Sequence, residues 1–451
     1  MTAAFTLTDD YIDAFGAAAY LWAWPLINIR NRRTVMDQLP APGLLQGIAP
    51  AAPPGRIAML HDYVEPAERL VACPNQDVAY GFGMAAADIG PVVIQVPDFG
   101  ERFWVYQAVD QRTDSFIQLG AMYDSAPGHY LLAPASWDGA VPDGIASVFR
   151  YDTAVAIVIP RVFLNDTAED RAAILPLLSQ ISMYPLEEYD GTMKSTDWTA
   201  LPQYGKAAGA NADEAETRWV DPTRFADDLA RVLDEVPPRP GEEAVYATYR
   251  QLADTAATDG HVRERLNAAA GAADGGLVAG LFQFRNNGVP VGNHWSTVRN
   301  GARFGDDYLA RTAMAKANIF VNAPNETGYF YQDLDADGNR LDGRRRYAIT
   351  FPVGGLPPVR GFWSLTLYNE HHFFHANDLS RYSLGTKNTT LTVAPDGSLT
   401  LLAGGIRPEN AAELANWLPA PDGPFSLYLR AYWPEDAIRD GSWAPPSVSL
   451  Q

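Results

Sequence analysis

Two regions rich in β-forming residues, separated by a segment of helical composition, are the feature that most constrains this fold. Between residues 91 and 163, runs of Val, Ile, Phe, Tyr and Trp alternate with turn signals such as Asp138-Gly139 at intervals of roughly ten residues. Similar runs return near the C-terminus, where apolar Phe425, Leu427 and Leu429 alternate with more polar neighbours, as on a strand with one buried face. The sequence therefore predicts a mainly β protein of the α+β class, built from two β domains.

The 451 residues exceed what a single hydrophobic core usually supports, so more than one domain is expected. Between the β regions the content of Ala, Leu, Asp, Glu and Arg rises, and Ile174, Leu178 and Ile181 fall on one helical face. We therefore divide the chain into an N-terminal helix with its connection, a first β domain, a mostly helical insert and a second β domain. The corresponding residues are 1–55, 56–165, 166–273 and 274–451.

A helix is predicted at the start of the chain. Thr8 followed by Asp9 and Asp10 is a helix start, and apolar residues then recur at helical spacing as far as Trp22. Pro25 is expected to end this amphipathic helix. In the second β domain, strands are predicted over residues 346–351, 362–368, 391–394, 399–402 and 425–432.

The balance of charge limits the partners of the protein. A net charge of −20 repels nucleic-acid phosphates and anionic lipid headgroups, and acidic residues closely precede the one basic run, Arg344 to Arg346. No run approaches the roughly 18 apolar residues that a membrane helix requires. We therefore expect a small-molecule ligand, with neither a nucleic-acid nor a membrane partner.

The N-terminus and the cysteine content indicate a compartment. Residues 1–15 have no basic n-region and are acidic where a signal peptide would be apolar. The single Cys73 excludes an internal disulfide framework and any multi-cysteine metal site. A cytoplasmic location is predicted, and Cys73, which precedes a proline in an apolar setting, is interpreted as a buried, inert thiol.

Two parts of the chain resemble protein families. Similarity to the domain of unknown function 1254 rests on Cys73-Pro74-Asn75-Gln76-Asp77-Val78-Ala79-Tyr80 and on Arg102-Phe103-Trp104. Similarity to the domain of unknown function 1214 rests on Gly361-Phe362-Trp363-Ser364-Leu365-Thr366-Leu367-Tyr368 and on Arg430-Ala431-Tyr432. The resemblance is to a bacterial tandem family and implies two jelly-roll-like β-sandwich domains with a helical middle segment, assembling into homo-oligomers. It implies no catalytic residues.

A histidine-rich segment after the strand 362–368 is the first candidate site. Histidine titrates near neutrality, so His371 or His372 is the candidate general base or acid, with Glu370 as its orienter. Asn377 and Arg381, which are candidate substrate-binding residues, lie close enough in sequence to orient or perturb the histidine. His294 is a further catalytic candidate, and Arg381, or His294 with Arg299, is the candidate anion stabiliser. The alternative is a packed strand edge whose histidines bond to backbone groups.

The same segment bears on metal binding. If the strand continued, His371 and His375 would share a face but lie roughly 13 Å apart, whereas zinc requires nitrogens about 2 Å away. No metal and no organic cofactor are therefore predicted. A divalent metal is the alternative, and it requires a turn in this segment or a partner such as His294.

Two further clusters are candidate substrate-binding sites. His294, Trp295 and Arg299 can clamp a carboxylate or stack on a ring, or can equally anchor a domain interface. Asn75 and Asp77, with Arg102 and Trp104 on the following strand, form the other cluster, although Asn and Asp in such loops most often make local turn bonds. A buried ion pair between Asp77 and Arg102 would be a functional candidate if the two residues meet.

Two functions remain open from the sequence. The first is a cofactor-free enzyme that acts on a small organic substrate by hydrolysis, elimination or proton transfer, in a pocket between the β domains. The second is a ligand-binding, glycan-binding or assembly module without catalysis, with which eleven Trp and twenty-one Tyr are compatible. A flat exposed row of aromatic rings would favour binding, and an enclosed pocket with converging His and Glu would favour catalysis.

Overall fold

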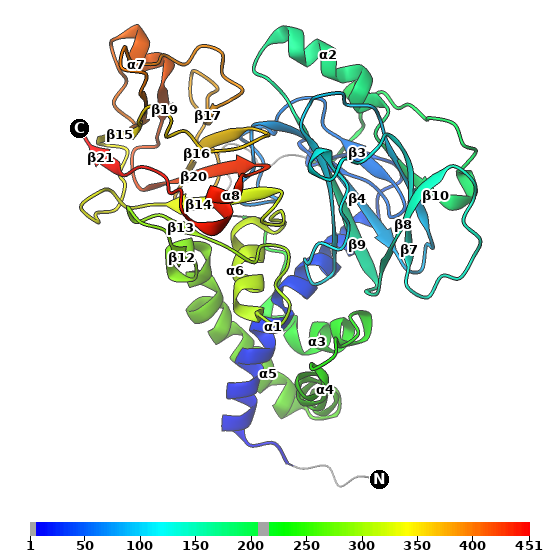
Figure 1. Ribbon diagram of the computed structural model, residues 1–451. Coiled ribbons are helices and arrows are strands. Elements are labelled where there is room, and N and C mark those ends of the chain that lie inside the picture. The colour runs from blue at the N-terminus through cyan, green and yellow to red at the C-terminus, as the bar shows by residue number, and fades with distance from the viewer. Residues whose placement is uncertain (1–5, 206–215) are drawn as a thin grey trace.

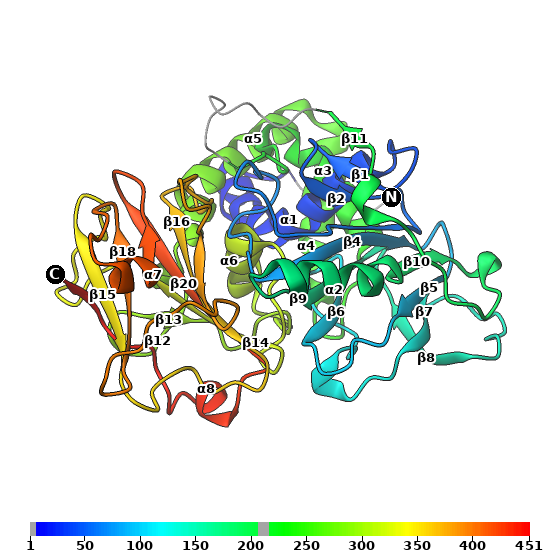
Figure 2. The same cartoon turned by 90° about the horizontal axis from the view of Figure 1, so that it is seen from above.

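Two β domains lie side by side, and a bundle of helices joins them (Figures 1 and 2). This arrangement is that of a computed structural model, which describes residues 6–205 and 216–451. Residues 1–5 and 206–215, which fall in the predicted N-terminal and middle segments, lie outside the described residues. The α+β class predicted from the sequence is confirmed, because helices and several multi-strand sheets occur in the same chain.

The first β domain consists of two four-stranded sheets packed face to face. Their strand orders are β3-β4-β9-β6 and β10-β5-β7-β8. Ala79 and Val158 of the first sheet share one buried apolar cluster with Ile94 and Leu132 of the second. The strands are β3 Ile57–Met59, β4 Val78–Ala86, β5 Val92–Val96, β6 Trp104–Asp110, β7 Gly128–Pro134, β8 Ile145–Tyr151, β9 Val155–Phe163 and β10 Ser182–Pro185.

The second β domain is also a pair of packed sheets, with strand orders β12-β13-β14-β20-β16-β17 and β19-β18-β15-β21. Leu365 and Leu429 of the larger sheet share a buried cluster with Ile349 and Leu401 of the smaller one. The strands are β12 Val289–Pro290, β13 Ser296–Thr297, β14 Thr327–Gln332, β15 Arg346–Phe351, β16 Trp363–Asn369, β17 Ser383–Gly385, β18 Leu399–Gly404, β19 Trp417–Pro419, β20 Phe425–Tyr432 and β21 Val448–Leu450.

The helix α1, Asp9–Met36, is the axis of the bundle and packs against α3, α4, α5 and α6 (Figure 1). A small sheet of order β11-β1-β2 lies after its C-terminal end. The remaining elements are β1 Gly43–Leu45, β2 Ala49–Ala51, α2 Ala168–Ser179, β11 Gln203–Tyr204, α3 Phe225–Glu235, α4 Glu243–Thr258, α5 Gly260–Ala273, α6 Tyr308–Asn318, α7 Ala411–Ala415 and α8 Asp436–Asp440.

Pro25 does not end α1, so the expected helix boundary is wrong. Proline has no N–H for the carbonyl four residues earlier, which is Leu21 in this helix. The hydroxyl of Thr312, in α6, donates to the Leu21 carbonyl at 2.6 Å and replaces the missing backbone donor. Trp22 to Ile29 are buried without interruption, so α1 is a central helix and not an amphipathic surface helix.

Two expectations about the second β domain also need correction. Residues 391–394 form no strand, because the side chain of Asn416 satisfies both backbone groups of Thr392, at 2.8 and 2.7 Å. All residues of β20 are buried, including the more polar face with Tyr428, Arg430 and Tyr432. That face packs toward the first β domain and does not contact solvent.

The predicted domain boundaries stay predictions. Strand β10 lies inside the segment predicted to be a mostly helical insert, yet it pairs with β5 of the first β domain, with Met183 opposite Ile94. The helices α3, α4 and α5 of the same segment instead pack on α1.

Candidate functional site

A cavity of about 120 Å³ lies between the two β domains. Strands β4 and β9 form one wall, and β14 and β20 form the other. In each wall an arginine stands directly opposite a tyrosine on the neighbouring strand, Arg161 opposite Tyr80 and Arg430 opposite Tyr329. Directly opposed residues project from the same face of a sheet, so each pair reaches the cavity together.

Two more charged side chains line the cavity. Arg32, near the C-terminal end of α1, lies over the ring of Trp219 at 4.3 Å. Glu68 lies between β3 and β4, where its Oε1 accepts hydrogen bonds from the backbone N–H groups of Leu70 and Val71. The Glu68 Oε2 is buried and has no partner within the part of the chain that the structure describes.

Apolar side chains fill the wall between these charges. Ile48 comes from the turn between β1 and β2, Val64 from the β3–β4 connection, and Phe82 and Ile159 from β4 and β9. Phe320 closes the side of the second domain. The cavity is therefore a largely apolar chamber with a few polar groups, which is the usual form of a small-molecule site.

Burial raises the pKa of Glu68 to about 7, against the opposing effects of the Val71 and Leu70 N–H groups and of Arg32. Near neutral pH the carboxyl therefore exists in both forms and can give or take a proton. Burial also lowers the pKa of Arg32 to about 10, which leaves its guanidinium charged at pH 7.

Cys73 and His372 meet beside this cavity, with Sγ 3.3 Å from Nδ1. Both residues have left-handed backbone conformations, and the N–H of Cys73 donates to the carbonyl of His372 at 2.9 Å. Burial raises the pKa of the thiol to about 12 and lowers that of the imidazole to about 3. At neutral pH the thiol keeps its proton and the ring is uncharged, so the pair does not form a reactive thiolate.

A polar cleft of about 590 Å³ lies on the other side of Ile48 and Val64, which line both spaces. Lys387 lines the cleft, and its Nζ is 3.3 Å from Oδ1 of Asp77. Ser383 donates to the same oxygen at 2.9 Å. Asp77 directly precedes β4 and Lys387 follows β17, so this buried ion pair joins the two β domains.

Two families match the chain in this order. Residues 54–185 match the family described as "Protein of unknown function (DUF1254)", and residues 326–436 match "Protein of unknown function (DUF1214)". The chain is a tandem DUF1254–DUF1214 protein. The first match contains Glu68, Tyr80 and Arg161, and the second contains Tyr329 and Arg430, so the cavity lies between the two matched domains.

A solved structure shares the fold. The crystal structure of the VPA0106 protein from Vibrio parahaemolyticus aligns with a TM-score of 0.64 and 20% identity, covering 98% of this chain and 100% of that chain. An uncharacterized protein from Burkholderia cenocepacia aligns with a TM-score of 0.43 and 11% identity over 98% of this chain and 94% of that chain, which is too distant to support an argument. No curated protein matches the sequence.

In this DUF1254–DUF1214 protein, the predicted histidine segment does not form one site. Strand β16 ends at Asn369 and a turn follows, so the histidines do not continue the strand. His371 is half-buried, with its Nε2 4.0 Å from Oε1 of Glu370, whereas His372 is buried against the rings of Phe282 and Tyr331. The turn separates the two histidines into different environments.

Asn377 and Arg381 order the chain beyond this turn. The Oδ1 of Asn377 accepts hydrogen bonds from the backbone N–H groups of Leu379 and Arg381, both at 3.2 Å. The Nη1 of Arg381 donates to the carbonyls of Leu414 and Trp417, at 2.6 and 3.0 Å. Arg381 lines the polar cleft together with Lys387, and His371 does not line it.

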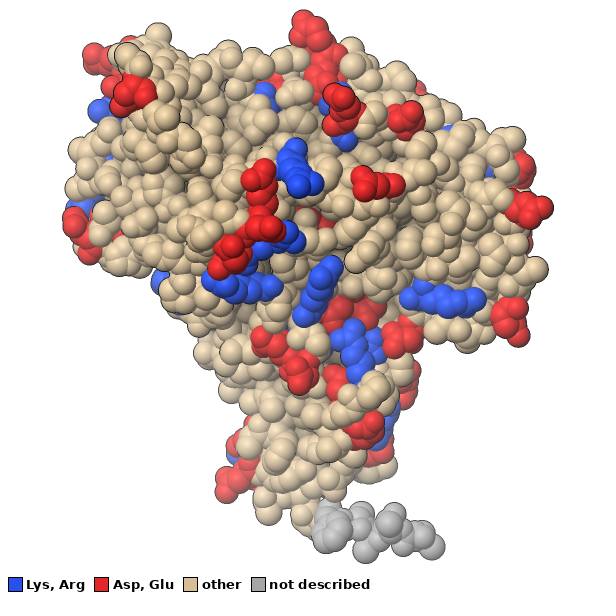
Figure 3. All heavy atoms as spheres, viewed as in Figure 1, with Lys and Arg blue, Asp and Glu red and all other residues tan. Residues whose placement is uncertain are grey.

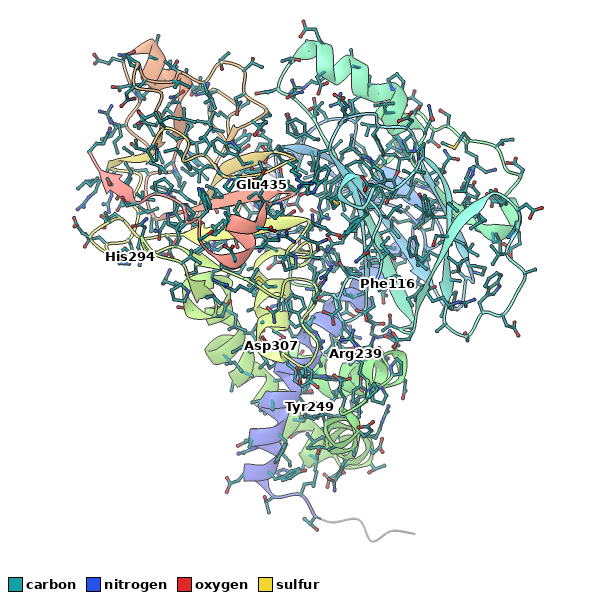
Figure 4. The ribbon with its side chains drawn as sticks, viewed as in Figure 1. Phe116, Arg239, Tyr249, His294, Asp307 and Glu435 are labelled. Carbon is teal, nitrogen blue, oxygen red and sulfur yellow. The ribbon has the colours of Figure 1, made fainter. Side chains whose placement is uncertain are left out.

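The cluster of His294, Trp295 and Arg299 lies on the outer side of the second β domain. Figure 4 shows His294 at the edge of this domain, far from Phe116 of the first domain. Trp295 is buried and its Nε1 donates to the carbonyl of Pro446 at 2.8 Å, whereas His294 and Arg299 are exposed. None of these three residues lines the cavity or the polar cleft.

The remaining predicted residues have separate partners. Asp77 and Arg102 do not meet, because Arg102 forms a bidentate pair with Asp170 of α2 at 2.7 and 2.5 Å. Asn75 donates to the hydroxyl of Tyr432, which links the first domain to the second. Trp104 lies in the core between the sheets of the first domain.

The residues that line the cavity were missed by the sequence reasoning. Arg161 and Arg430 carried a signal, since each is a charged residue inside an otherwise apolar run, in β9 and β20. No comparable local signal marks Arg32 and Glu68 of the cavity or Lys387 of the polar cleft, because each gains its role from residues distant in the chain.

The described residues contain neither a metal-binding cluster nor a membrane-spanning helix. No group of three or more His, Cys, Asp or Glu able to hold a metal ion occurs in residues 6–205 and 216–451. Among the helices described here, none is long and apolar enough to span a bilayer. Figure 3 shows acidic and basic side chains interspersed on the viewed face, with several Lys and Arg near its centre.

Proposed function

We propose that this protein is a cofactor-free enzyme that transfers a proton to or from a small organic molecule bound in the cavity between its β domains. The carboxyl of Glu68 carries the proposal, because it is buried in the wall of a largely apolar chamber and leaves Oε2 without a partner among the described residues. Proton transfer, and not hydrolysis or elimination, is the simplest chemistry that one such carboxyl supports.

The fixed geometry of Glu68 supports this role. Two backbone N–H groups hold Oε1, so the main chain sets the carboxyl plane, and Oε2 is enclosed in the wall without a partner among the described residues. Burial brings the pKa of the group to about 7, where the acid and its conjugate base are both populated. Glu68 therefore replaces Glu370, His371, His372 and His294 as the catalytic candidate.

A binding protein without catalysis is the second candidate. The observation that favours it is that the other titratable neighbours, Cys73 and His372, are uncharged at neutral pH and leave Glu68 to act alone. Stacking of a glycan on a surface row of rings is less favoured, because Phe15 is the one aromatic residue among the exposed large apolar side chains that the structure describes. Jelly-roll-like domains, homo-oligomers and a cytoplasmic location stay proposals that accompany either function.

Solvent-deuterium exchange tests the proton-transfer proposal. Small ketones and 2-oxo acids that bind the protein by calorimetry are incubated with it in deuterium oxide, and exchange of their acidic C–H protons is followed by proton NMR. We expect exchange with the wild-type protein and none with Glu68→Gln, which preserves the shape of the side chain and removes its acidity. His371→Gln is the matched control and should exchange like the wild type. Bound compounds that never exchange, or that exchange equally with Glu68→Gln, would leave only the binding function.

A further inference from the structure

Three buried guanidinium groups surround the cavity. Arg32, Arg161 and Arg430 are 3%, 4% and 2% exposed, and all three line it. They reach it from α1, from the first β domain and from the second β domain respectively. Three cations of this kind, brought to one small chamber from three parts of the fold, require a physical explanation.

The hydrogen-bond partners of these guanidinium groups are all uncharged. Each group donates to amide oxygens, hydroxyls or backbone carbonyls, which orient the arginine without neutralising it. The acceptors are Asn28 and the Leu70 carbonyl for Arg32, Gln107, Asn322 and the Phe320 carbonyl for Arg161, and Thr366, Tyr368 and the Cys73 carbonyl for Arg430.

No carboxylate among the described residues lies within 4.0 Å of any of the three. The contrast within the same chain is direct, because the equally buried Arg112 and Arg311 each contact an aspartate, at 2.8 and 3.3 Å. A buried charge is normally paired, since leaving it unpaired is costly. The cavity therefore holds three guanidinium groups without an ion-pair partner among the described residues, and the carboxyls of Glu68 and Glu216 act on Arg32 only from beyond 4.0 Å.

Each of the three groups also keeps a nitrogen available. Within the described residues, Nη1 of Arg32 and the Nε atoms of Arg161 and Arg430 donate to no acceptor. None of these atoms is among the fully enclosed unpartnered polar atoms of the structure, so they retain access to open space. Donors of this kind suit an anionic oxygen acceptor.

We propose that the cavity binds a small organic acid, with its carboxylate among Arg32, Arg161 and Arg430 and its apolar body against Ile48, Phe82 and Ile159. The proposal rests on the proposed function and names the substrate class of the same cavity. The carboxylate supplies the ion-pair partner that the described residues do not give these arginines, and the apolar lining excludes water from the body of the molecule.

Isothermal calorimetry with matched acids and amides tests this proposal. Benzoate and hexanoate are titrated into the whole protein at neutral pH, beside benzamide and hexanamide, which have nearly the same shape and no charge. We expect each acid to bind about tenfold or more tightly than its amide, as a charge-assisted hydrogen bond implies. Equal affinities, or binding of the amides alone, would overturn the proposal, as would failure of both acids to bind at millimolar concentration.

Arginine substitutions test whether the preference for acids over amides arises in the cavity. Arg430→Met should abolish the preference for acids, and Arg430→Lys should retain part of it, since lysine keeps the charge but loses the fork of donors. Arg381→Met is the matched control, because Arg381 also donates to two neutral carbonyls but lines the polar cleft. If Arg430→Met does not fold, the comparison of acid with amide in the wild type and in Arg430→Lys still decides the question. A preference lost in Arg381→Met and kept in Arg430→Lys would place the acid in the cleft and refute the proposal.

The two proposals can fail separately. A preference for acids in both the wild type and Glu68→Gln, without deuterium exchange in either, would refute proton transfer and leave the ligand class standing. Exchange that depends on Glu68 but occurs equally well with neutral ketones would leave proton transfer standing and refute the organic acid.

Discussion

The pH dependence of stability tests the environment of Glu68 in quantitative terms. Its pKa is about 7 in the folded protein, against an ordinary value of 4.5. One pKa unit corresponds to about 1.36 kcal/mol, so ionisation of Glu68 costs about 3 kcal/mol of folding free energy. The side chain is buried, so solvent does not screen this cost.

The raised pKa of Glu68 determines the direction in which folding stability changes with pH. Below about pH 4.5 the carboxyl is protonated in both the folded and the unfolded chain, and its contribution to stability is complete. Between pH 4.5 and 7 the folded protein keeps the proton and the unfolded chain loses it, so the contribution falls as the pH rises. Above about pH 7 both states are ionised and the loss is complete.

Urea denaturation followed by tryptophan fluorescence provides the assay. The free energy of unfolding is measured for the wild type and for Glu68→Gln from about pH 4.5 to about pH 8, and the difference between the two proteins removes the contributions of all other groups. We expect the wild type to lose about 3 kcal/mol relative to Glu68→Gln over this range. A difference in unfolding free energy that stays constant with pH would refute the assignment of Glu68 as a buried carboxyl with few hydrogen-bond partners.

Three other predictions concern residues outside the cavity wall or at its margin. Lys387→Met should destabilise the protein by about 3 to 5 kcal/mol in urea denaturation, because it leaves Asp77 buried without its cation, while the double variant Lys387→Met with Asp77→Asn should recover much of that loss. Thr312→Val should cost about 1 to 3 kcal/mol by removing the donor to the Leu21 carbonyl, and Thr312→Ser, which keeps the hydroxyl, should cost much less; equal losses would contradict the role of that hydrogen bond. The Cys73 thiol, with its pKa raised to about 12 by burial, should resist iodoacetamide in the native protein and react after unfolding in urea, and rapid native labelling would contradict its burial.

The architecture could be predicted from the sequence because strand and turn signals are local. The strands β15 and β20 were predicted with their observed bounds, since each is a run of β-forming residues with turn residues beside it. The continuation of α1 past Pro25 could not be predicted from the sequence, because the hydroxyl that bonds to the free Leu21 carbonyl belongs to Thr312, far along the chain. The burial of both faces of β20 was missed for the same reason, since the covering surface is another domain.

The candidate site was less accessible than the fold. The sequence favoured histidines as candidates because their ordinary pKa is near neutrality. Burial determines the charge of His372, and burial cannot be read from one sequence. Glu68, in contrast, has no feature in the sequence that suggests a functional role. It becomes a candidate only because Arg32, Arg161 and Arg430 line the same cavity. A functional pocket between the β domains was predicted and stays a proposal, and the residues that line the cavity found there were not predicted.

A crystal soaked with 4-bromobenzoate tests the central claim most directly, because the anomalous signal of bromine locates the molecule without reference to any enzymatic assay. We predict a bromine peak inside the cavity between the β domains, near Phe82 and Ile159, with the carboxylate directed to the guanidinium of Arg430. A peak in the polar cleft beside Lys387, or an empty cavity in crystals whose protein binds the compound in solution, would contradict the assignment of this cavity as the functional site.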